Sequence, residues 1–227
     1  MREEFTAGEK RSRAVFLTAL SMVFTLMVWL INVKPVGPRE SSVGLAFLNE
    51  PVFKALGVSA KWYGLSEVLG YLALALAGMM GVIGLIQLIH RRKLLKVDPE
   101  ILSLGILYGV TLLLYILFDK IAINYRPLVV DGLLEPSYPS SHTMLSLVVF
   151  GSGLWMLKRY FYPGKLQRVL MICAGALLVL TVLARLLSGY HWLTDIIGGI
   201  LMATMLLAWF DVVLFQLKTW RREQKRV

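Results

Sequence analysis

A histidine and an aspartate lie four residues apart, at His191 and Asp195, where an apolar helix is expected to begin. Residues at this spacing share one helix face, so the carboxylate can hold one ring nitrogen while the other points outward. Such a carboxylate fixes the tautomer and stabilises the positive charge that forms when the ring attacks phosphorus. Arg185, at the end of the preceding helix, can lean over the same point. The three residues predict an imidazole nucleophile beside a cation.

Two serines and a second histidine open another apolar helix, at Ser140, Ser141 and His142. A helix N-terminus presents unsatisfied N–H groups and a partial positive charge, which suit an anion. His142 is expected in the first turn, where an imidazole can give a proton to a leaving oxygen. The simpler interpretation is that one of the serines only caps the helix.

A lysine and an arginine, Lys120 and Arg126, follow a third apolar helix. Their point charge and planar fork of donors suit phosphate oxygens, although basic residues at a helix end are usually interfacial anchors. Together the three segments bring two histidines, one carboxylate and several cations to one membrane face. Cations outnumber carboxylates there and would repel a divalent ion, so neither a metal ion nor another cofactor is expected.

These segments resemble the type 2 phosphatidic acid phosphatase superfamily, which also includes glucose-6-phosphatases and vanadium haloperoxidases. The family pattern is Lys, six residues, Arg-Pro; then Pro-Ser-Gly-His; then Ser-Arg, five residues, His, three residues, Asp. The third block matches at residues 185–195 with the family spacing, and the second matches at residues 139–142. The resemblance spans about residues 120–195 by motif.

The sequence departs from that pattern at three places. Lys120 and Arg126 have five residues between them instead of six, so Asp119 stands at the strictly aligned place. Ser141 replaces the family glycine, and Ala184 replaces the serine before the arginine. The shortened spacing leaves Lys120 one place away from the family lysine.

The resemblance implies a role for each site residue. His191 would attack phosphorus to form a phosphohistidine, and Asp195 would orient it. His142 would protonate the leaving group and later activate water, and no metal would be needed. The residues that would hold the phosphoryl oxygens are Lys120, Arg126, Ser140, Ser141 and Arg185.

The elements that must position these residues are membrane helices. Of the 227 residues, 57% are hydrophobic and 17% charged, more apolar than one soluble core requires. A helix needs roughly 20 mostly apolar residues to cross a bilayer. The predicted fold is therefore all-α, a polytopic membrane protein with one domain over residues 1–227. Its six expected transmembrane helices are residues 14–33, 65–89, 101–118, 143–157, 169–187 and 196–216.

Most of the 24 basic residues fall at the two ends of the chain and in the loops 90–100 and 158–168. Cytoplasmic loops carry the excess of Lys and Arg, so both termini are predicted to be cytoplasmic and the site extracytoplasmic. The long segment 34–64 is apolar and aromatic, with a short helix expected over residues 49–57 that Asn49 caps. This interfacial segment fits a lid for a lipid or a simple anchor equally well.

The favoured function is an integral plasma-membrane phosphatase for lipid phosphates or pyrophosphates. Undecaprenyl pyrophosphate, phosphatidylglycerol phosphate and phosphatidate are the substrates that the family implies. A lipid phosphotransferase with the same site is one alternative. A transporter or scramblase is another, disfavoured because the helices look nearly free of charge, with Asp211 the clearest exception. The expected partner is a membrane lipid and not nucleic acid, because the net charge of +10 follows the topology.

Overall fold

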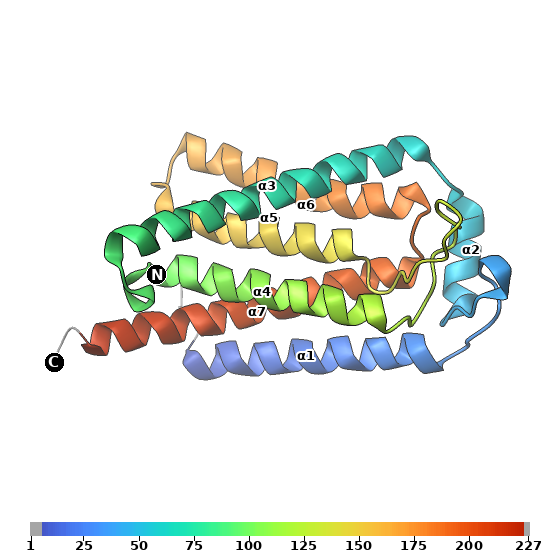
Figure 1. The fold of residues 1–227 in the computed structure, drawn as a ribbon, viewed down its shortest axis with the longest axis horizontal. Helices are drawn as coiled ribbons and strands as arrows, with labels where there is room; N and C mark the ends of the chain where they lie inside the picture. Colours follow the sequence, from blue (N-terminus) through green and yellow to red (C-terminus); the bar gives the residue numbers. More distant parts are fainter. Residues whose placement is uncertain (1–5, 225–227) are drawn as a thin grey trace.

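A computed structural model describes residues 6–224, which form a bundle of long helices running along one axis (Figure 1). The regular structure is helical throughout, which confirms the all-α prediction. Two short 3₁₀ helices, Pro38–Glu40 and Leu94–Lys96, lie in the connections. The α-helices are α1 (Ala7–Leu30), α2 (Ala46–Leu56), α3 (Ala60–Arg91), α4 (Pro99–Lys120), α5 (Ser141–Tyr160), α6 (Lys165–Ser188) and α7 (Leu193–Gln224).

Five of these helices, α1, α3, α4, α6 and α7, are long and apolar enough to cross a membrane. They contain five of the six predicted segments almost entirely, which agrees with a multi-pass membrane protein. The sixth segment, residues 143–157, forms α5, whose 20 residues extend about 30 Å at 1.5 Å per residue. Since α5 does not reach the same apolarity, the count of six spans stays a prediction.

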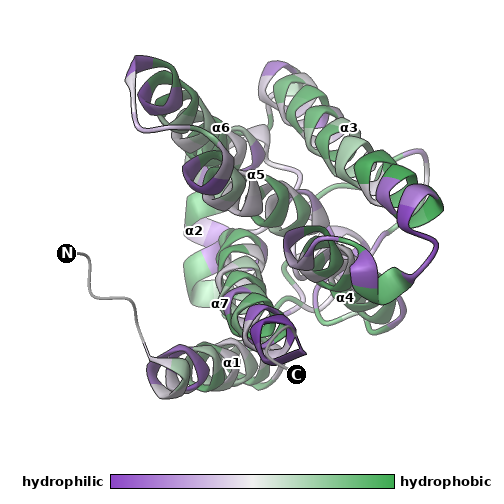
Figure 2. Ribbon diagram, turned by 90° about the vertical axis from the view of Figure 1, so that its left-hand side faces the viewer, coloured by the Kyte–Doolittle hydropathy of each residue, from purple (hydrophilic) through white to green (hydrophobic). Residues whose placement is uncertain are grey.

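The position of α5 explains its weaker hydropathy. It packs against α3, α4, α6 and α7, and Figure 2 shows it among these helices in the end-on view. Because protein covers it on several sides, α5 can carry fully buried polar side chains such as Ser146 and Ser152 without exposing them to lipid. A helix that protein covers can therefore be less apolar than a helix that contacts lipid.

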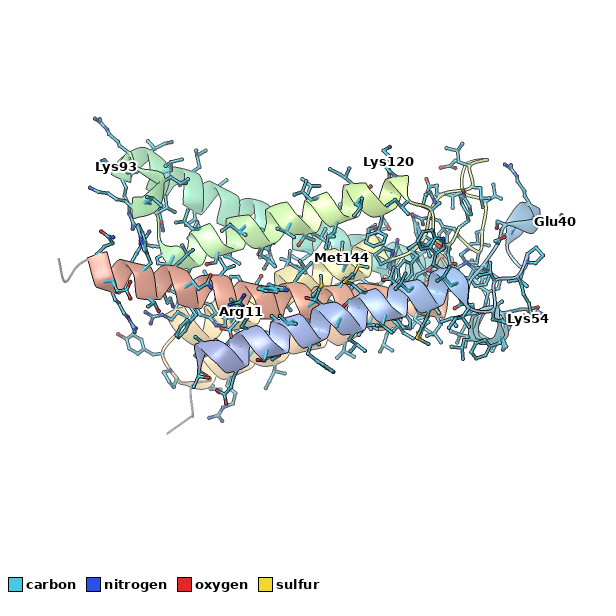
Figure 3. All side chains as sticks on the ribbon, turned by 90° about the horizontal axis from the view of Figure 1, so that it is seen from below. Arg11, Glu40, Lys54, Lys93, Lys120 and Met144 are labelled. Atoms are coloured by element: carbon cyan, nitrogen blue, oxygen red, sulfur yellow. The ribbon has the colours of Figure 1, made fainter. Side chains whose placement is uncertain are left out.

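The two ends of the bundle differ. The first described helix begins and the last one ends at the same end, and α2 lies at the other (Figure 1). Hydrophilic residues gather at the helix ends near the termini (Figure 2). Arg11 and Lys93 lie toward that end, whereas Glu40 and Lys54 lie at the end with α2 (Figure 3).

Helix α1 begins seven residues earlier than expected, so it includes Lys10. The Lys10 ammonium lies 2.6 Å from a carboxylate oxygen of Asp211 on α7. The paired charges allow both helices to be longer than their apolar segments.

The short helix α2 exists, but its predicted start at Asn49 is wrong. It begins at Ala46, and Asn49 lies inside it with a buried side chain. The Asn49 amide donates to the Gly44 carbonyl and to the Thr194 hydroxyl, at 2.8 and 2.9 Å, and its oxygen accepts from Thr194 N at 3.1 Å. These bonds attach α2 to the first turn of α7, beside the candidate site.

Helices α5 and α7 approach closely at Gly199. A Cβ at this position would lie 2.9 Å from the Ser140 carbonyl oxygen and 3.0 Å from Thr143 Cβ. The absent side chain lets the start of α5 rest directly on α7. This contact brings the segment that carries His142 next to the segment that carries His191.

Candidate active site

His191 lies in the short loop between α6 and α7, at the end of the bundle that carries α2. Gly189 ends α6 with φ 72°, and a Cβ there would lie 2.2 Å from the Gly57 carbonyl oxygen. Glycine therefore satisfies both the left-handed backbone and the close approach. The turn places His191 in the interior, where it is 4% exposed.

The two ring nitrogens of His191 have different partners. Nε2 lies 3.4 Å from Arg185 Nη2, and because an arginine nitrogen only donates, Nε2 must accept with its lone pair. The proton of the neutral ring is then on Nδ1, which donates to the Ser137 carbonyl oxygen at 3.1 Å. Burial, followed by the charge of Arg185, holds the His191 pKa well below its usual 6.5. At neutral pH the ring is thus uncharged, and Nε2 carries the lone pair.

Asp195 lies beside this ring without bonding it directly. Its Oδ2 atom is 3.6 Å from His191 Nδ1, which is longer than a hydrogen bond. The fully buried carboxylate instead accepts from Trp192 N at 3.0 Å and from Asn124 Nδ2 at 3.2 Å. The predicted proximity is present, but the Ser137 carbonyl holds the tautomer, and the Asp195 carboxyl group lies close enough to stabilise a positive charge that develops on the ring.

Arg185 lies between the two histidines and is 1% exposed. Its Nη2 donates to His142 Nδ1 at 3.1 Å and lies 3.4 Å from His191 Nε2. Its Nη1 donates to Ser66 Oγ at 2.8 Å and to Glu67 Oε1 at 3.0 Å, both on α3. Arg185 Nε is buried and has no partner among the described residues. One guanidinium therefore covers both imidazole lone pairs and keeps a donor free.

His142 lies in the first turn of α5, as predicted, and its protonation follows from its neighbours. Because Arg185 donates to Nδ1, the proton of the neutral ring is on Nε2. That nitrogen lies 3.1 Å from Glu67 Oε1. Glu67 is thus a member of the cluster that sequence reasoning missed.

An acidic residue within an apolar helix was the signal that could have identified Glu67. The prediction that Asp211 is the clearest charge within the helices is wrong. Glu67 on α3 joins the site, and the buried Glu100 on α4 pairs with Lys218 at 2.9 Å. Each of these carboxylates is compensated by a cation from another helix, which sequence alone does not show.

The start of α5 combines a cap with free N–H groups. Ser140 Oγ accepts from Thr143 N at 3.4 Å and from the Thr143 hydroxyl at 3.0 Å, so its side chain caps the helix. Ser141 contributes to the lining of a pocket that also reaches His191. The N–H groups of Ser141 and His142, in the first turn, remain for an anion.

Arg126 faces that pocket, which has a volume of about 170 Å³. Its Nε lies 3.0 Å from Glu135 Oε2 but makes no hydrogen bond, and the buried Ser137 Oγ also has no partner among residues 6–224. Unpartnered buried donors are costly unless a ligand completes them. The lining residues are Tyr115, Phe118, Asp119, Arg126, Glu135, Pro136, Ser137, Tyr138, Pro139, Ser141, Met144 and His191.

Lys120 is the one predicted site residue that the structure leaves outside the cluster. Its side chain is 78% exposed, and its ammonium lies 3.5 Å from Asp119. Figure 3 shows Lys120 at the outer edge of α4, whereas Met144 lies in the interior. The neighbouring Asp119 contributes to the pocket wall instead. Within residues 6–224, no group of three His, Cys, Asp or Glu side chains is arranged to hold a metal ion.

Two histidines around a buried arginine, beside a helix N-terminus and a second arginine, form a centre suited to a phosphoryl group. The family model of the PAP2 superfamily matches residues 76–219, which include α4 to α6, the second half of α3 and most of α7. The chain belongs to the PAP2 superfamily. The resemblance inferred from the three motifs is thereby confirmed.

Two known proteins are similar to the chain. Phosphatidylglycerophosphatase B of Bacillus subtilis (strain 168) is 30% identical over 108 residues, which are 47% of this chain and 51% of that protein. The match therefore spans about half the length of this curated relative. The crystal structure of a transmembrane PAP2 type phosphatidylglycerolphosphate phosphatase from Bacillus subtilis superposes with a TM-score of 0.59 at 18% identity, over 93% of this chain and 96% of that one. At that identity the superposition establishes the fold.

Proposed function

We propose that this chain is a membrane phosphatase that hydrolyses lipid phosphates or pyrophosphates through a phosphohistidine on His191, without a metal ion. The observation that carries the proposal is the Arg185 guanidinium, which donates to the lone pairs of both histidines. A phosphoryl oxygen is a stronger acceptor for an arginine than an imidazole nitrogen. Phosphate binding would draw the guanidinium to the ligand and free both lone pairs together.

The first chemical step would form a bond between His191 Nε2 and phosphorus as the bond to the leaving oxygen breaks. His142, after its freed Nδ1 lone pair has taken a proton from solvent, would give that proton to the leaving oxygen. In the second step His142 would take a proton from water, the water oxygen would attack phosphorus, and the bond to His191 would break. Throughout, the phosphoryl oxygens would be held by Arg126, Arg185 and the N–H groups of Ser141 and His142.

The pocket wall supports a lipid substrate. Tyr115 and Phe118 on α4 and Met144 on α5 line it, and Tyr115 is exposed on the outer surface of an apolar helix. A headgroup in the pocket would therefore leave its apolar chains beside α4, at the depth of the bilayer. A soluble phosphate ester would not use this wall.

The charge distribution supports an extracytoplasmic site in the plasma membrane. Basic residues concentrate at the end of the bundle that carries the described termini, opposite the site. The named relative makes phosphatidylglycerol phosphate one candidate substrate. The proposed side also suits undecaprenyl pyrophosphate, whose phosphate is removed outside the cytoplasm, and phosphatidate remains a third candidate.

The test is phosphate release from these three lipids by purified protein and by His191→Ala. The wild type should release phosphate from at least one, and the variant should release none while keeping its thermal unfolding profile. Activity of the variant above a trace would contradict the nucleophile assignment. A labelled pyrophosphate lipid would separate the alternatives, because a phosphotransferase labels an acceptor lipid, and a scramblase moves the lipid without cleaving it.

A further inference from the structure

Helix α3 presents a polar face to the site, although it carries none of the three motifs. Tyr63, Ser66, Glu67 and Gly70 have the spacing i, i+3, i+4 and i+7, so they share one side of the helix. The rest of α3 is largely apolar and exposed to lipid. A carboxylate in such a helix costs free energy, so an acidic residue there usually has a functional role.

Half of this face supports Arg185. Its Cζ atom lies 5.6 Å from the centre of the Tyr63 ring, and its Nη1 donates to Ser66 and Glu67. Tyr63 also stacks on Tyr190, with ring centres 4.0 Å apart. These contacts keep the guanidinium between the two histidines.

The other half supports His142. Glu67 Oε1 lies 3.1 Å from His142 Nε2, and the imidazole lies against Gly70 one turn further along α3. A Cβ at Gly70 would lie 2.8 Å from His142 Cδ2 and 3.2 Å from Nε2. The missing side chain at Gly70 and the carboxylate at Glu67 together define where the ring lies and which way it faces.

We propose that Glu67 is the positioning residue of His142, holding its Nε2–H so that Nδ1 is the nitrogen that gives and takes the catalytic proton. The inference rests on the proposed function. It gives each histidine its own support: the Ser137 carbonyl orients His191 from Nδ1, and Glu67 orients His142 from Nε2. Both reactive nitrogens then face Arg185, which is where a phosphoryl group would bind.

The proton balance follows from this arrangement. Once Arg185 moves to the phosphate, Nδ1 takes a proton from solvent; in the first step that proton passes to the leaving oxygen, and Nε2–H keeps its hydrogen bond to Glu67. In the second step Nδ1 accepts the proton of the attacking water while the bond between phosphorus and His191 breaks. The negative charge of Glu67 stabilises the imidazolium before the first step and after the second.

The kinetic test compares Glu67→Gln with Glu100→Gln. The second variant removes the charge of a buried carboxylate on the neighbouring apolar helix α4. Rapid-quench measurements would follow phosphohistidine formation from a long-chain alkyl phosphate and from a nitroaryl phosphate with the same chain. A nitroaryl leaving group needs little protonation. Glu67→Gln should slow the alkyl reaction about tenfold and the nitroaryl reaction less than about twofold, and Glu100→Gln should slow neither. Equal slowing of both by Glu67→Gln would overturn the proposal and leave only support of Arg185.

A spectroscopic test does not depend on turnover. The chain has three histidines, so ¹⁵N-histidine spectra in detergent can be assigned with single variants of His90 and His142. The wild type at neutral pH should show His142 with its proton on Nε2, and an Nδ1–H tautomer would overturn the proposal. If the wild type forms no phosphohistidine from either substrate, the proposed function fails, and a comparison of the His142 spectra of the wild type and Glu67→Gln still decides the role of Glu67.

Discussion

Replacing Asp195 by asparagine separates charge from orientation at the nucleophile. The Ser137 carbonyl holds the Nδ1–H tautomer of His191, so the variant should keep the ring in place. What it loses is a negative charge 3.6 Å from Nδ1. It also loses one acceptor, because Trp192 N and Asn124 Nδ2 both donate to the carboxylate and an amide has a single oxygen.

The size of the catalytic loss can be worked from that distance. Two unit charges 3.6 Å apart attract by about 4 to 5 kcal/mol at an effective dielectric constant of 20. If the ring carries about half a positive charge in the transition state, the loss is about 2 kcal/mol, or roughly 30-fold in rate. Mispairing of one buried donor should lower stability by a further ~1–3 kcal/mol without entering the rate.

The assay is the rate of phosphohistidine formation by rapid quench, with thermal unfolding of the same samples. Asp195→Asn should fall well between the wild type and His191→Ala. A variant as fast as wild type would refute the electrostatic role of Asp195. A folded variant as inactive as His191→Ala would refute the conclusion that the Ser137 carbonyl, and not Asp195, holds the tautomer.

Three other predictions follow from the geometry. Gly199→Ala should lower the midpoint of thermal unfolding by several degrees, because its Cβ would lie 2.9 Å from the Ser140 carbonyl oxygen. The control Gly78→Ala should leave the midpoint unchanged, because a Cβ there has no atom within 4 Å. Equal midpoints for the two variants would contradict the close approach at Gly199. Lys120→Ala should keep turnover within about twofold of wild type, because an exposed lysine paired with its neighbour contributes little to phosphate binding. A large loss of turnover would show that this lysine helps to hold the phosphate. Because the folded-state pKa of His191 is lowered, the unfolded chain binds more protons below about pH 6.5, and stability should fall as the pH falls through that window. His191→Gln should lose less stability between pH 7 and pH 5 than wild type, and an identical pH dependence of thermal unfolding would contradict the lowered pKa.

The sequence by itself determined the parts of this protein that depend on local pattern. Apolar runs identify α1, α3, α4, α6 and α7 because lipid exposure requires continuous hydrophobicity. The motif spacing brought His142, Arg185, His191 and Asp195 into one predicted cluster, and the structure places these four side chains together. Helical periodicity and membrane topology are sufficient for these predictions, because they depend only on the pattern within each segment and on which segment ends lie at the same membrane face.

Only the tertiary structure decided the partners of these residues. Glu67 reaches His142 and Arg185 from a helix outside the motifs, the Ser137 carbonyl takes the bond expected of Asp195, and Lys120 points away. Each outcome depends on the rotation of one helix against another and on distances of a few tenths of an ångström. Such distances are set by packing at contacts like Gly70 against His142, which no spacing along a single chain encodes.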